Sequence, residues 1–170
     1  LEAKEQGLVR FLGVTGHGTY APAMHMQSLE AYPFDSILVP YNYTMMQQPQ
    51  YAHDFNALYD MCQARGVAMQ TIKGIAARRW QDGDEEKRFS WYRPITDADA
   101  MKRAIDFVLS RENLFINTSS DATLLERSLD AIAQPTAEVN SALLAEDAQR
   151  LGVEALFVRD VSDDVIISAG

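Results

Sequence analysis

The sequence contains little cysteine, no long apolar run and no excess of positive charge. Cys62 is the only cysteine among the 170 residues, which excludes an internal disulfide bond and a zinc site made of several cysteines. We therefore expect a reducing, cytoplasmic location. No apolar stretch approaches the ~20 residues of a membrane-spanning helix, so we expect no membrane partner. The net charge of −9 argues against a nucleic-acid partner, because binding to phosphate backbones requires clustered positive charge.

Several short motifs of well-known enzymes are also missing. The chain has neither the G-x-S-x-G turn of serine hydrolases nor the G-x-G-x-x-G loop of dinucleotide-binding folds. His17, His25 and His53 raise the alternative of a metal site, with Asp35 or Asp54 as further ligands. No His-x-His pair occurs, however, and the spacing of metal ligands is absent, so we predict no metal site.

Four apolar, strand-like segments are present, and each ends in a small or polar cluster. They are Val9–Val14 before Thr15-Gly16-His17-Gly18, Ser36–Pro40 before Tyr41-Asn42, Val67–Ile72 before Lys73-Gly74, and Leu114–Asn117 before Thr118-Ser119-Ser120. A helical pattern follows each segment, and such a succession gives parallel strands, because the crossover helix returns the chain to the same edge. All four clusters are therefore expected at one end of one sheet, where barrel and doubly wound enzymes bind ligands.

The spacing of apolar residues predicts the helices. The first expected helix is Ala23–Ala31, and the second has the buried stripe Phe55, Leu58, Tyr59 and Cys62 and ends at Gly66. A Thr96/Asp99 capping box opens the third, whose stripe is Met101, Ala104, Ile105 and Val108. The fourth has the stripe Leu124, Leu125, Ser128 and Leu129, and the last is expected from Ala137 to about Leu151, ending at Gly152. Gln81–Pro94 has charges followed by aromatic residues without a period, which predicts a long loop, and such loops in compact domains are usually functional or mobile. The tail Asp160–Gly170 is expected to be frayed or an appendage.

The length predicts about half of a barrel. A complete (β/α)₈ barrel needs roughly 250 residues, so four strand–helix units amount to about half of one. The expected fold class is α/β, a parallel (β/α)₈ TIM barrel of which this chain forms the C-terminal half. We assign residues 1–135 to this half barrel and residues 136–170 to a C-terminal helix and tail. Leu1–Gln6 has the pattern of a helix already under way, so we expect a longer parent protein.

Two groups of residues are candidates for binding an anion. Ser119, Ser120 and Asp121 open a helix directly after the last expected strand, where free backbone N–H groups and the helix dipole attract phosphate. A simple helix cap explains the same residues, and the two interpretations are compatible. Lys73, Arg78 and Arg79 follow the third strand, where they are candidates for pairing with a nucleotide phosphate or are ordinary surface cations.

Four segments resemble the C-terminal half of the aldo/keto reductase barrel, in the correct order. The regions of its fifth, sixth, seventh and eighth strands are similar, in that order, to Arg10–Gly18, Phe34–Asn42, Arg65–Ala76 and Leu114–Asp130. The resemblance implies reduction of a small carbonyl substrate to an alcohol by hydride transfer from NADPH or NADH. In that family the catalytic residues come from the N-terminal half of the barrel, so the resemblance implies that this missing half is a partner. Tyr41, Lys73 and His17 do not take the place of those residues.

The resemblance also implies a set of cofactor-binding residues. Thr15 and Gly16 stand where the family holds the nicotinamide amide, Leu38 replaces a glutamine there, and Ile72 replaces the tyrosine that stacks on the nicotinamide ring. The full expected set is Thr15, Gly16, His17, Leu38, Ile72, Lys73, Gly74, Ser119, Ser120 and Arg127. Ser119 and Ser120 match the loop that holds the adenosine phosphate, and Arg127 lies one turn beyond the position of an arginine that holds the 2′-phosphate.

Two other functions remain open at this point. Replacement of several nicotinamide contacts favours a non-catalytic pseudoenzyme or assembly module. Lysine at the end of a barrel strand favours a barrel lyase or hydrolase, with Lys73 as a Schiff-base amine or His17 as a base or ligand. Fold class alone does not choose among these functions.

Overall fold

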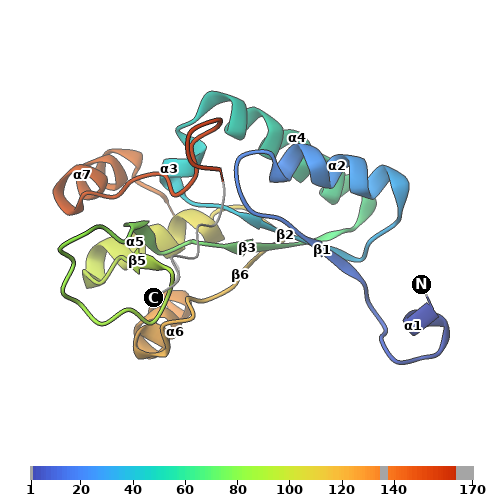
Figure 1. Ribbon diagram of the computed structural model, residues 1–170, viewed down its shortest axis with the longest axis horizontal. Helices are drawn as coiled ribbons and strands as arrows, with labels where there is room; N and C mark the ends of the chain where they lie inside the picture. The colour runs from blue at the N-terminus through green and yellow to red at the C-terminus, as the bar shows by residue number, and fades with distance from the viewer. Residues whose placement is uncertain (1, 135–137, 164–170) are drawn as a thin grey trace.

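A four-stranded parallel sheet forms the centre of the molecule in the computed structural model, which describes residues 2–134 and 138–163. The strands are β1 (Gly13–Thr15), β2 (Ser36–Pro40), β3 (Ala68–Ile72) and β6 (Leu114–Ile116), in the order β1-β2-β3-β6 (Figure 1). The expected α/β class with parallel strands is confirmed. Within the described residues no helix is long and apolar enough to cross a membrane.

Helices α2 (Ala21–Ala31) and α4 (Pro49–Arg65) pack together beside this sheet (Figure 1). Alternate strand residues point toward them: Ile37 and Val39 of β2 and Met69 of β3 are fully buried. They pack in one core with helix residues that include Leu29, Phe55, Leu58 and Cys62. The predicted end of α4 is confirmed, because Gly66 has φ +67°, a left-handed conformation that glycine adopts without strain.

The intervening strand residues form a less buried face. Thr15, Leu38, Gln70 and Phe115 are register partners across all four strands, so they form one row on this face. Leu38 and Gln70 are half-buried, and Phe115 is 56% exposed. In the described part of the chain β1 and β6 are the outer strands of the sheet. One face is therefore sealed by helices, whereas the opposite row remains accessible.

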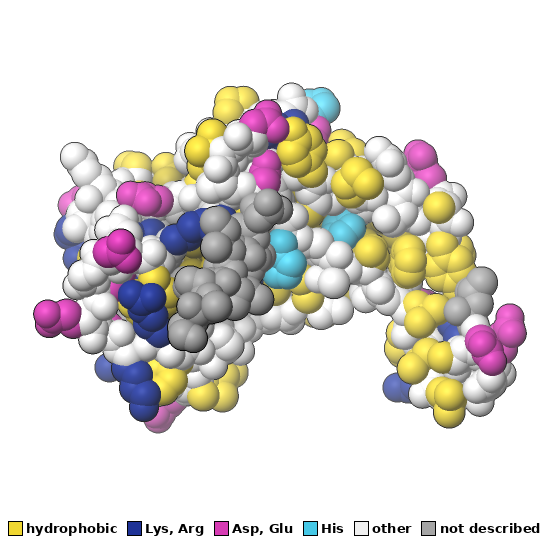
Figure 2. Space-filling model, in the orientation of Figure 1, with side chains coloured by type: hydrophobic (Ala, Val, Ile, Leu, Met, Phe, Trp, Pro, Cys, Tyr) yellow, Lys and Arg dark blue, Asp and Glu magenta, His cyan; other side chains and the backbone are white. Residues whose placement is uncertain are grey.

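The first strand begins later than predicted. The expected range was Val9–Val14, but β1 starts at Gly13, and the side chains of Leu8 and Phe11 are 72% and 67% exposed. The reason is a local hydrogen-bond network: the Leu12 N–H donates to Asp35 Oδ2 at 2.8 Å, and the Asp35 N–H donates to the Leu12 carbonyl at 2.8 Å. Helix α1 (Glu2–Glu5) and this apolar segment stand apart from the body of the molecule (Figure 2).

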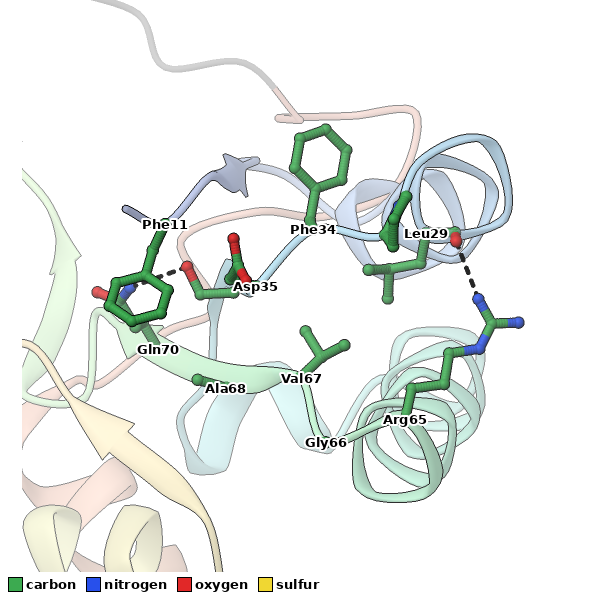
Figure 3. Close-up of a pocket in the computed structure, with 11 residues that line it drawn as sticks. Phe11, Leu29, Phe34, Asp35, Arg65, Gly66, Val67, Ala68 and Gln70 are labelled. Atoms are coloured by element: carbon green, nitrogen blue, oxygen red, sulfur yellow. Dashed lines mark hydrogen bonds between the residues drawn. The ribbon is translucent and has the colours of Figure 1, made fainter. Parts of the chain in front are cut away.

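A cavity of about 640 Å³ lies at the amino ends of β2 and β3. Phe11, Phe34 and Val67 line it, and Arg65 lies at one side, where its guanidinium donates to the Leu29 carbonyl at 2.9 Å (Figure 3). This cavity is at the end of the sheet opposite to the clusters predicted to bind a ligand. It therefore does not belong to the candidate site.

An antiparallel hairpin follows β3 and was not predicted. Its strands are β4 (Ala76–Arg79) and β5 (Tyr92–Pro94). The prediction of a loop over Gln81–Pro94 is therefore wrong for its last three residues, because pairing with a distant strand orders them. The long connection is itself tied down: Arg78 makes two 2.7 Å hydrogen bonds to the carboxylate of Asp84.

Helix α5 (Ala98–Leu109) carries the predicted buried stripe Met101, Ala104, Ile105 and Val108. Its cap is Asp97 rather than Thr96, since the Asp97 side chain accepts the Ala100 N–H at 2.9 Å. After β6, a 3₁₀ turn η1 (Ala122–Leu124) leads into α6 (Leu125–Ala133).

The predicted stripe of α6 is only half correct. Leu124 and Ser128 are buried, but Leu125 and Leu129 are 43% and 53% exposed, and Ala131 is buried instead. The buried residues Leu124, Ser128 and Ala131 recur at i, i+4 and i+7, so they form one side of the helix, and Leu125 and Leu129 lie beyond the edge of that side.

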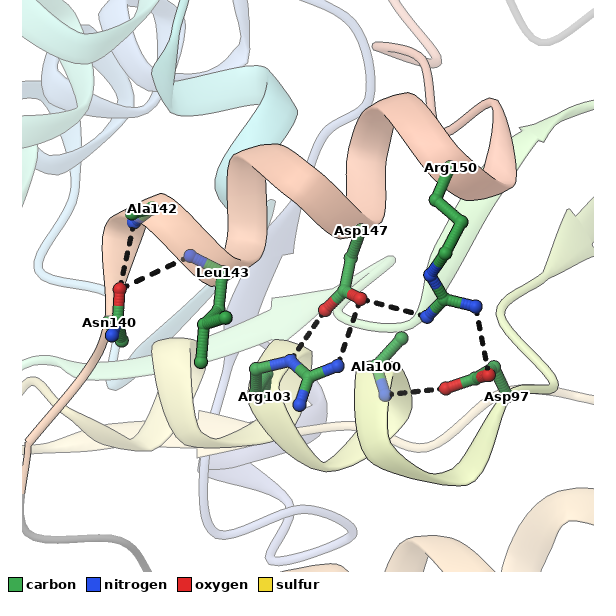
Figure 4. Close-up of polar contacts among 8 residues, drawn as sticks. All are labelled: Asp97, Ala100, Arg103, Asn140, Ala142, Leu143, Asp147 and Arg150. Atoms are coloured by element: carbon green, nitrogen blue, oxygen red, sulfur yellow. Dashed lines mark hydrogen bonds and ion pairs between the residues drawn. The ribbon is translucent and has the colours of Figure 1, made fainter.

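The last helix, α7 (Ser141–Leu151), packs on α5, and residues of α7 and of the short helix α3 (Tyr43–Met46) line one small pocket. Gly152 ends it with φ +62°, as predicted. The helix starts at Ser141 because the Asn140 side chain caps it, so the predicted helix from Ala137 is wrong for residues 138–140; Ala137 itself lies outside the described residues. Asp147 of α7 accepts hydrogen bonds from Arg103 Nε at 2.6 Å and from Arg150 at 2.9 Å (Figure 4). The Arg103 contact joins α5 to α7, whereas the Arg150 contact lies within α7.

The segment after α7 folds back into the core. Leu156 and Phe157 are fully buried, and Asp163 accepts hydrogen bonds from the Thr19 N–H at 2.7 Å and from its hydroxyl at 2.6 Å. The prediction of a frayed tail is therefore wrong for residues 160–163, which are anchored to the loop after β1. Residues 164–170 of the predicted tail lie outside the described residues.

Candidate functional site

The turn after β1 and the middle of β2 meet at the carboxyl ends of the strands. Thr15 pairs with Leu38 across the sheet, and the Gly16 N–H donates to the Leu38 carbonyl at 3.1 Å. The Nε2 atom of His25 lies 3.0 Å from the same carbonyl, so this nitrogen carries a proton and donates. Thr15, Gly16 and Leu38, three of the expected cofactor-binding residues, are therefore neighbours.

Gly16 has a steric reason to be glycine. A Cβ atom at this position would lie 2.9 Å from the His25 ring and 3.0 Å from the Ala21 side chain. Gly74, at the end of β3, is similarly close to Val108, at 3.2 Å. These two glycines allow the turns to pack closely against neighbouring side chains, so both have a structural role.

Lys73 follows β3 directly and has an unusual backbone. Its φ of +68° is left-handed, a region that costs a lysine roughly 1–2 kcal/mol. Its carbonyl accepts hydrogen bonds from Asn42 Nδ2 at 3.0 Å and from the Ala76 N–H at 3.1 Å. Asn42 itself caps α3 by accepting the Met45 N–H at 2.9 Å. The surrounding turns therefore hold Lys73 in a strained but defined position.

Aromatic rings from the hairpin enclose the Lys73 ammonium group. Its Nζ atom lies 4.8 Å from the centre of the Trp91 ring and 5.3 Å from that of Tyr92. Trp91 in turn packs 5.9 Å from Phe157, and Phe157 packs 6.5 Å from His17. The site therefore combines the turns after β1 and β3 with the hairpin and the C-terminal segment.

Lys73, Trp91, Tyr92, Phe157 and His17 form an aromatic cluster, and burial determines the protonation of its titratable groups. Loss of solvent lowers the pKa of Lys73 to about 8, even though the aromatic rings attract its charge. Within the residues that the structure describes, no carboxylate forms an ion pair with Lys73. The pKa of His17 is lowered first by partial burial of its ring and then by the charge of Lys73, so its imidazole is neutral at pH 7.

Ser119, at the turn after β6, is connected to the same cluster. The Tyr92 hydroxyl donates to Ser119 Oγ at 3.2 Å, and the Asp121 N–H donates to that oxygen at 3.2 Å. The Ser120 hydroxyl donates to the Phe89 carbonyl of the hairpin at 3.3 Å. Lys73 and Ser119 thus share Tyr92 as a neighbour, which brings together the two expected phosphate contacts from β3 and β6.

The helix start after β6 is capped by a carboxylate. Asp121 Oδ1 accepts the Thr123 N–H at 3.0 Å and the Thr123 hydroxyl at 2.5 Å. The start is a three-residue 3₁₀ turn, so its dipole is short. The capping interpretation of this sequence is confirmed, and Lys73 is the more suitable centre for an anion than the helix start.

The predicted arginines are divided between structural contacts and the cluster. Arg78 pairs with Asp84, and Arg127 donates to the Thr96 carbonyl at 3.5 Å, away from Lys73 and Tyr92. Arg79 does reach the cluster, since its guanidinium carbon lies 5.9 Å from the Trp91 ring and 5.6 Å from the Phe157 ring. It also donates to the Leu156 and Ser162 carbonyls, so it anchors the C-terminal segment over the site.

Three members of the cluster, Trp91, Tyr92 and Phe157, were not identified from the sequence. Trp91 and Tyr92 had a signal, because they lie in the segment predicted to be a long loop that is functional or mobile. Phe157 had none, since its contact with Trp91 joins residues far apart in the sequence. Ile72 is half-buried directly before Lys73, where its side chain alternates with the buried Thr71.

Among the described residues no group of three or more histidine, cysteine or acidic side chains is placed to hold a metal ion. No protein-family model matches the chain, and no curated protein is similar to it. The resemblance to the aldo/keto reductases therefore rests on the four strand-end segments alone.

Proposed function

We propose that this chain binds NADPH or NADH at the carboxyl ends of its parallel strands. In this proposal it is the cofactor-binding half of an aldo/keto reductase-like (β/α)₈ barrel that reduces small carbonyl compounds. The observation that carries the proposal is the Lys73 ammonium group, which is half-buried beside Trp91 and Tyr92 without a carboxylate partner in the described residues. Such a charge favours an anionic ligand, and phosphate is the anion that a nicotinamide dinucleotide offers.

The other residues fit the parts of such a ligand. Lys73 and the Ser119 hydroxyl are suited to phosphate oxygens, while the half-buried Leu38 and Ile72 offer apolar surface for a flat ring. Thr15 presents a hydroxyl beside Leu38 for a polar ring substituent. The bound cofactor would supply a hydride, and this chain would orient it and exclude water. In the proposed division of labour, proton donation belongs to the other half of the barrel.

The test is a nucleotide titration followed by tryptophan fluorescence, because Trp91 is one of only two tryptophans and lies against Lys73. Ser119→Asp places a carboxylate beside the expected phosphate. It should weaken NADPH and NADH binding at least tenfold, in line with the ~1.5–3 kcal/mol of a hydrogen bond to a charged group. Ser141→Asp makes the same charge change on the exposed start of α7 and is the matched control. Equal affinities for both variants would contradict the phosphate assignment.

A second candidate function is an assembly module, which the accessible sheet row and outer strands favour. Unpaired strand edges are ready templates for pairing with another chain, and barrel closure removes them. We expect the chain to self-associate at micromolar concentration and to show no carbonyl reductase activity alone. Phe115→Lys should reduce this association in light scattering, whereas Phe89→Lys, at an exposed phenylalanine in the hairpin connection, should not. A monomer that is stable to dilution, or turnover of NADPH by the chain alone, would contradict this expectation.

A further inference from the structure

Lys73 differs from the other three lysines of the chain in its surroundings. Lys4 lies 3.0 Å from a carboxylate oxygen of Asp35, and Lys102 lies 2.5 Å from one of Asp106. Lys87 is exposed, with its ammonium 4.9 Å from the centre of the Phe89 ring. Lys73 alone of the four is half-buried between aromatic rings without an ion pair in the described residues. Burial lowers the pKa of this amine to about 8, so it loses its proton more easily than an ordinary lysine does.

The backbone around Lys73 fixes the position of this amine. Its left-handed conformation persists because Asn42 and the Ala76 N–H both bind its carbonyl. Strained residues persist where the surrounding structure holds them, and such positions concentrate at functional sites. The side chain extends from the carboxyl end of β3 toward the hairpin rings, at the edge of the sheet where parallel folds place their reactive groups.

We propose that Lys73 is the amine of a carbonyl-binding site and forms an imine with a small aldehyde that carries an anionic group. The proposal goes beyond nucleotide binding and does not depend on it. A lysine used in this way must be neutral, fixed in position and shielded from bulk water. Lys73 meets the last two conditions through Asn42, Trp91 and Tyr92, and burial lowers its pKa to about 8, so roughly one amine in ten is neutral at pH 7.

The reaction is balanced without any further reagent. The neutral amine of Lys73 attacks the carbonyl carbon, so that a C–N bond forms while the C=O π bond breaks. A proton moves from nitrogen to oxygen, which gives a carbinolamine. This intermediate loses its oxygen as water and completes the C=N bond. His17 lies within the electrostatic reach of Lys73, and its neutral imidazole is suited to accept and return the proton.

The preference for an anionic aldehyde follows from the charges around the amine. Lys73 and Arg79 both lie against the ring of Trp91, at 4.8 and 5.9 Å from its centre. When the Lys73 amine becomes an uncharged imine, the Arg79 guanidinium remains as a positive charge against the same ring. A phosphate or carboxylate on the aldehyde would be attracted to that charge, whereas a neutral aldehyde would not.

Pyridoxal 5′-phosphate is a suitable probe, with pyridoxal as the uncharged comparison. The full chain is incubated with each aldehyde at pH 7, the visible absorption of the imine is recorded, and borohydride reduction fixes the adduct for peptide mass spectrometry. At this pH a lysine with a pKa of about 8 has roughly two-hundredfold more neutral amine than an ordinary lysine. We expect at least about tenfold more label on Lys73 than on Lys87, and saturation at a lower concentration of the phosphorylated probe.

Matched variants separate imine formation from simple attraction of the probe. Lys73→Arg keeps the positive charge but cannot form an imine, so it should lose the visible band, whereas Lys87→Arg should retain it. Far-ultraviolet circular dichroism of both variants confirms that they are folded. Labelling of Lys87 equal to that of Lys73, or a visible band that survives in Lys73→Arg, would overturn the imine. Equal saturation by pyridoxal and its phosphate would overturn the preference for an anionic aldehyde.

Discussion

Arg103 and Lys73 are two half-buried cations whose surroundings differ completely. Arg103 of α5 donates two hydrogen bonds to Asp147, at 2.6 and 2.9 Å, and Asp147 also accepts one from Arg150 (Figure 4). Lys73 faces aromatic rings and has no carboxylate partner in the described residues. The first charge is neutralised within the fold, so it stabilises the contact between helices. The second is left for a ligand, which is why we place function at Lys73 and stability at Asp147.

The largest effect is expected from removing Asp147. Asp147→Ala leaves Arg103 without its carboxylate at a largely buried position, which should lower the free energy of unfolding by about 2–3 kcal/mol. Glu146→Ala removes an exposed carboxylate from the same helix and should change stability by less than about 0.5 kcal/mol. Urea denaturation measures both variants. Similar losses for the two would mean that the α5–α7 ion pairs add little to stability.

The next effect concerns ligand affinity rather than stability. Lys73→Met keeps the length of the side chain but removes its charge, so NADPH affinity should fall by roughly 1.5–2 kcal/mol, about tenfold or more. Lys87→Met changes the same charge in the exposed hairpin connection and should leave affinity nearly unchanged. Calorimetric titration gives both values. An unchanged affinity in Lys73→Met would remove the main support for the nucleotide site.

The contributions of Asp147 and Lys73 to the free energy of unfolding should depend on pH in different ranges, one acid and one alkaline. Arg103 holds the folded-state pKa of Asp147 below its ordinary value, so the stability from this contact is present above about pH 4 and is lost as the pH falls through that lowered pKa. Lys73 has a folded-state pKa of about 8, below the ~10.4 of an unfolded lysine, so the unfolded chain binds more protons between these values. Stability should therefore rise with pH from about 8 to about 10.

Denaturation curves at a series of pH values distinguish these two contributions. Lys73→Met should abolish the alkaline rise and leave the acid loss intact. Asp147→Asn should show the reverse pattern. If the alkaline rise survives in Lys73→Met, the buried amine is not its source.

The smallest effect is expected from changing the Trp91 ring beside Lys73. Trp91→Phe keeps a ring beside Lys73 but weakens the attraction between the ring and the ammonium by a few tenths of a kcal/mol, out of a typical ~0.5–1 kcal/mol. The pKa of Lys73 should fall slightly further, which NMR titration of the ¹³C-methylated amine detects. Trp80→Phe, whose ring faces Arg88 instead, is the control and should leave that pKa unchanged.

Local patterns predicted the elements that are determined by contacts between residues close together in the sequence. Strand β2 has the predicted bounds Ser36–Pro40, and Gly66 ends α4 as its position indicates. The start of β1 was missed because the Asp35 carboxylate binds the Leu12 N–H, and that contact has no sequence signature. The hairpin was missed for a similar reason, since its strands carry charges that satisfy no strand period.

The candidate site was predictable in its location and much less so in its composition. Thr15 and Lys73 were identified because parallel strands bring their carboxyl ends to one edge, whereas Leu38 came from the resemblance to the aldo/keto reductases. Phe157 and Asp163 were not, because they reach the site only through tertiary packing of a segment with little pattern of its own. Arg78, a candidate for either a phosphate contact or an ordinary surface cation, is paired with Asp84. Pairings of this kind depend on distances that a sequence does not contain.

The contact between Thr19 and Asp163 can form only late in the synthesis of the protein. These residues are separated by 144 positions, yet the Asp163 carboxylate binds both the N–H and the hydroxyl of Thr19. A ribosome that adds about 5–20 residues per second needs roughly 7–30 seconds to produce that stretch. During this interval the Gly16–Tyr20 turn has no partner for these groups, while β2 and β3 are already available to pair. The nascent chain can therefore form its sheet long before it can complete the turn beside the candidate site.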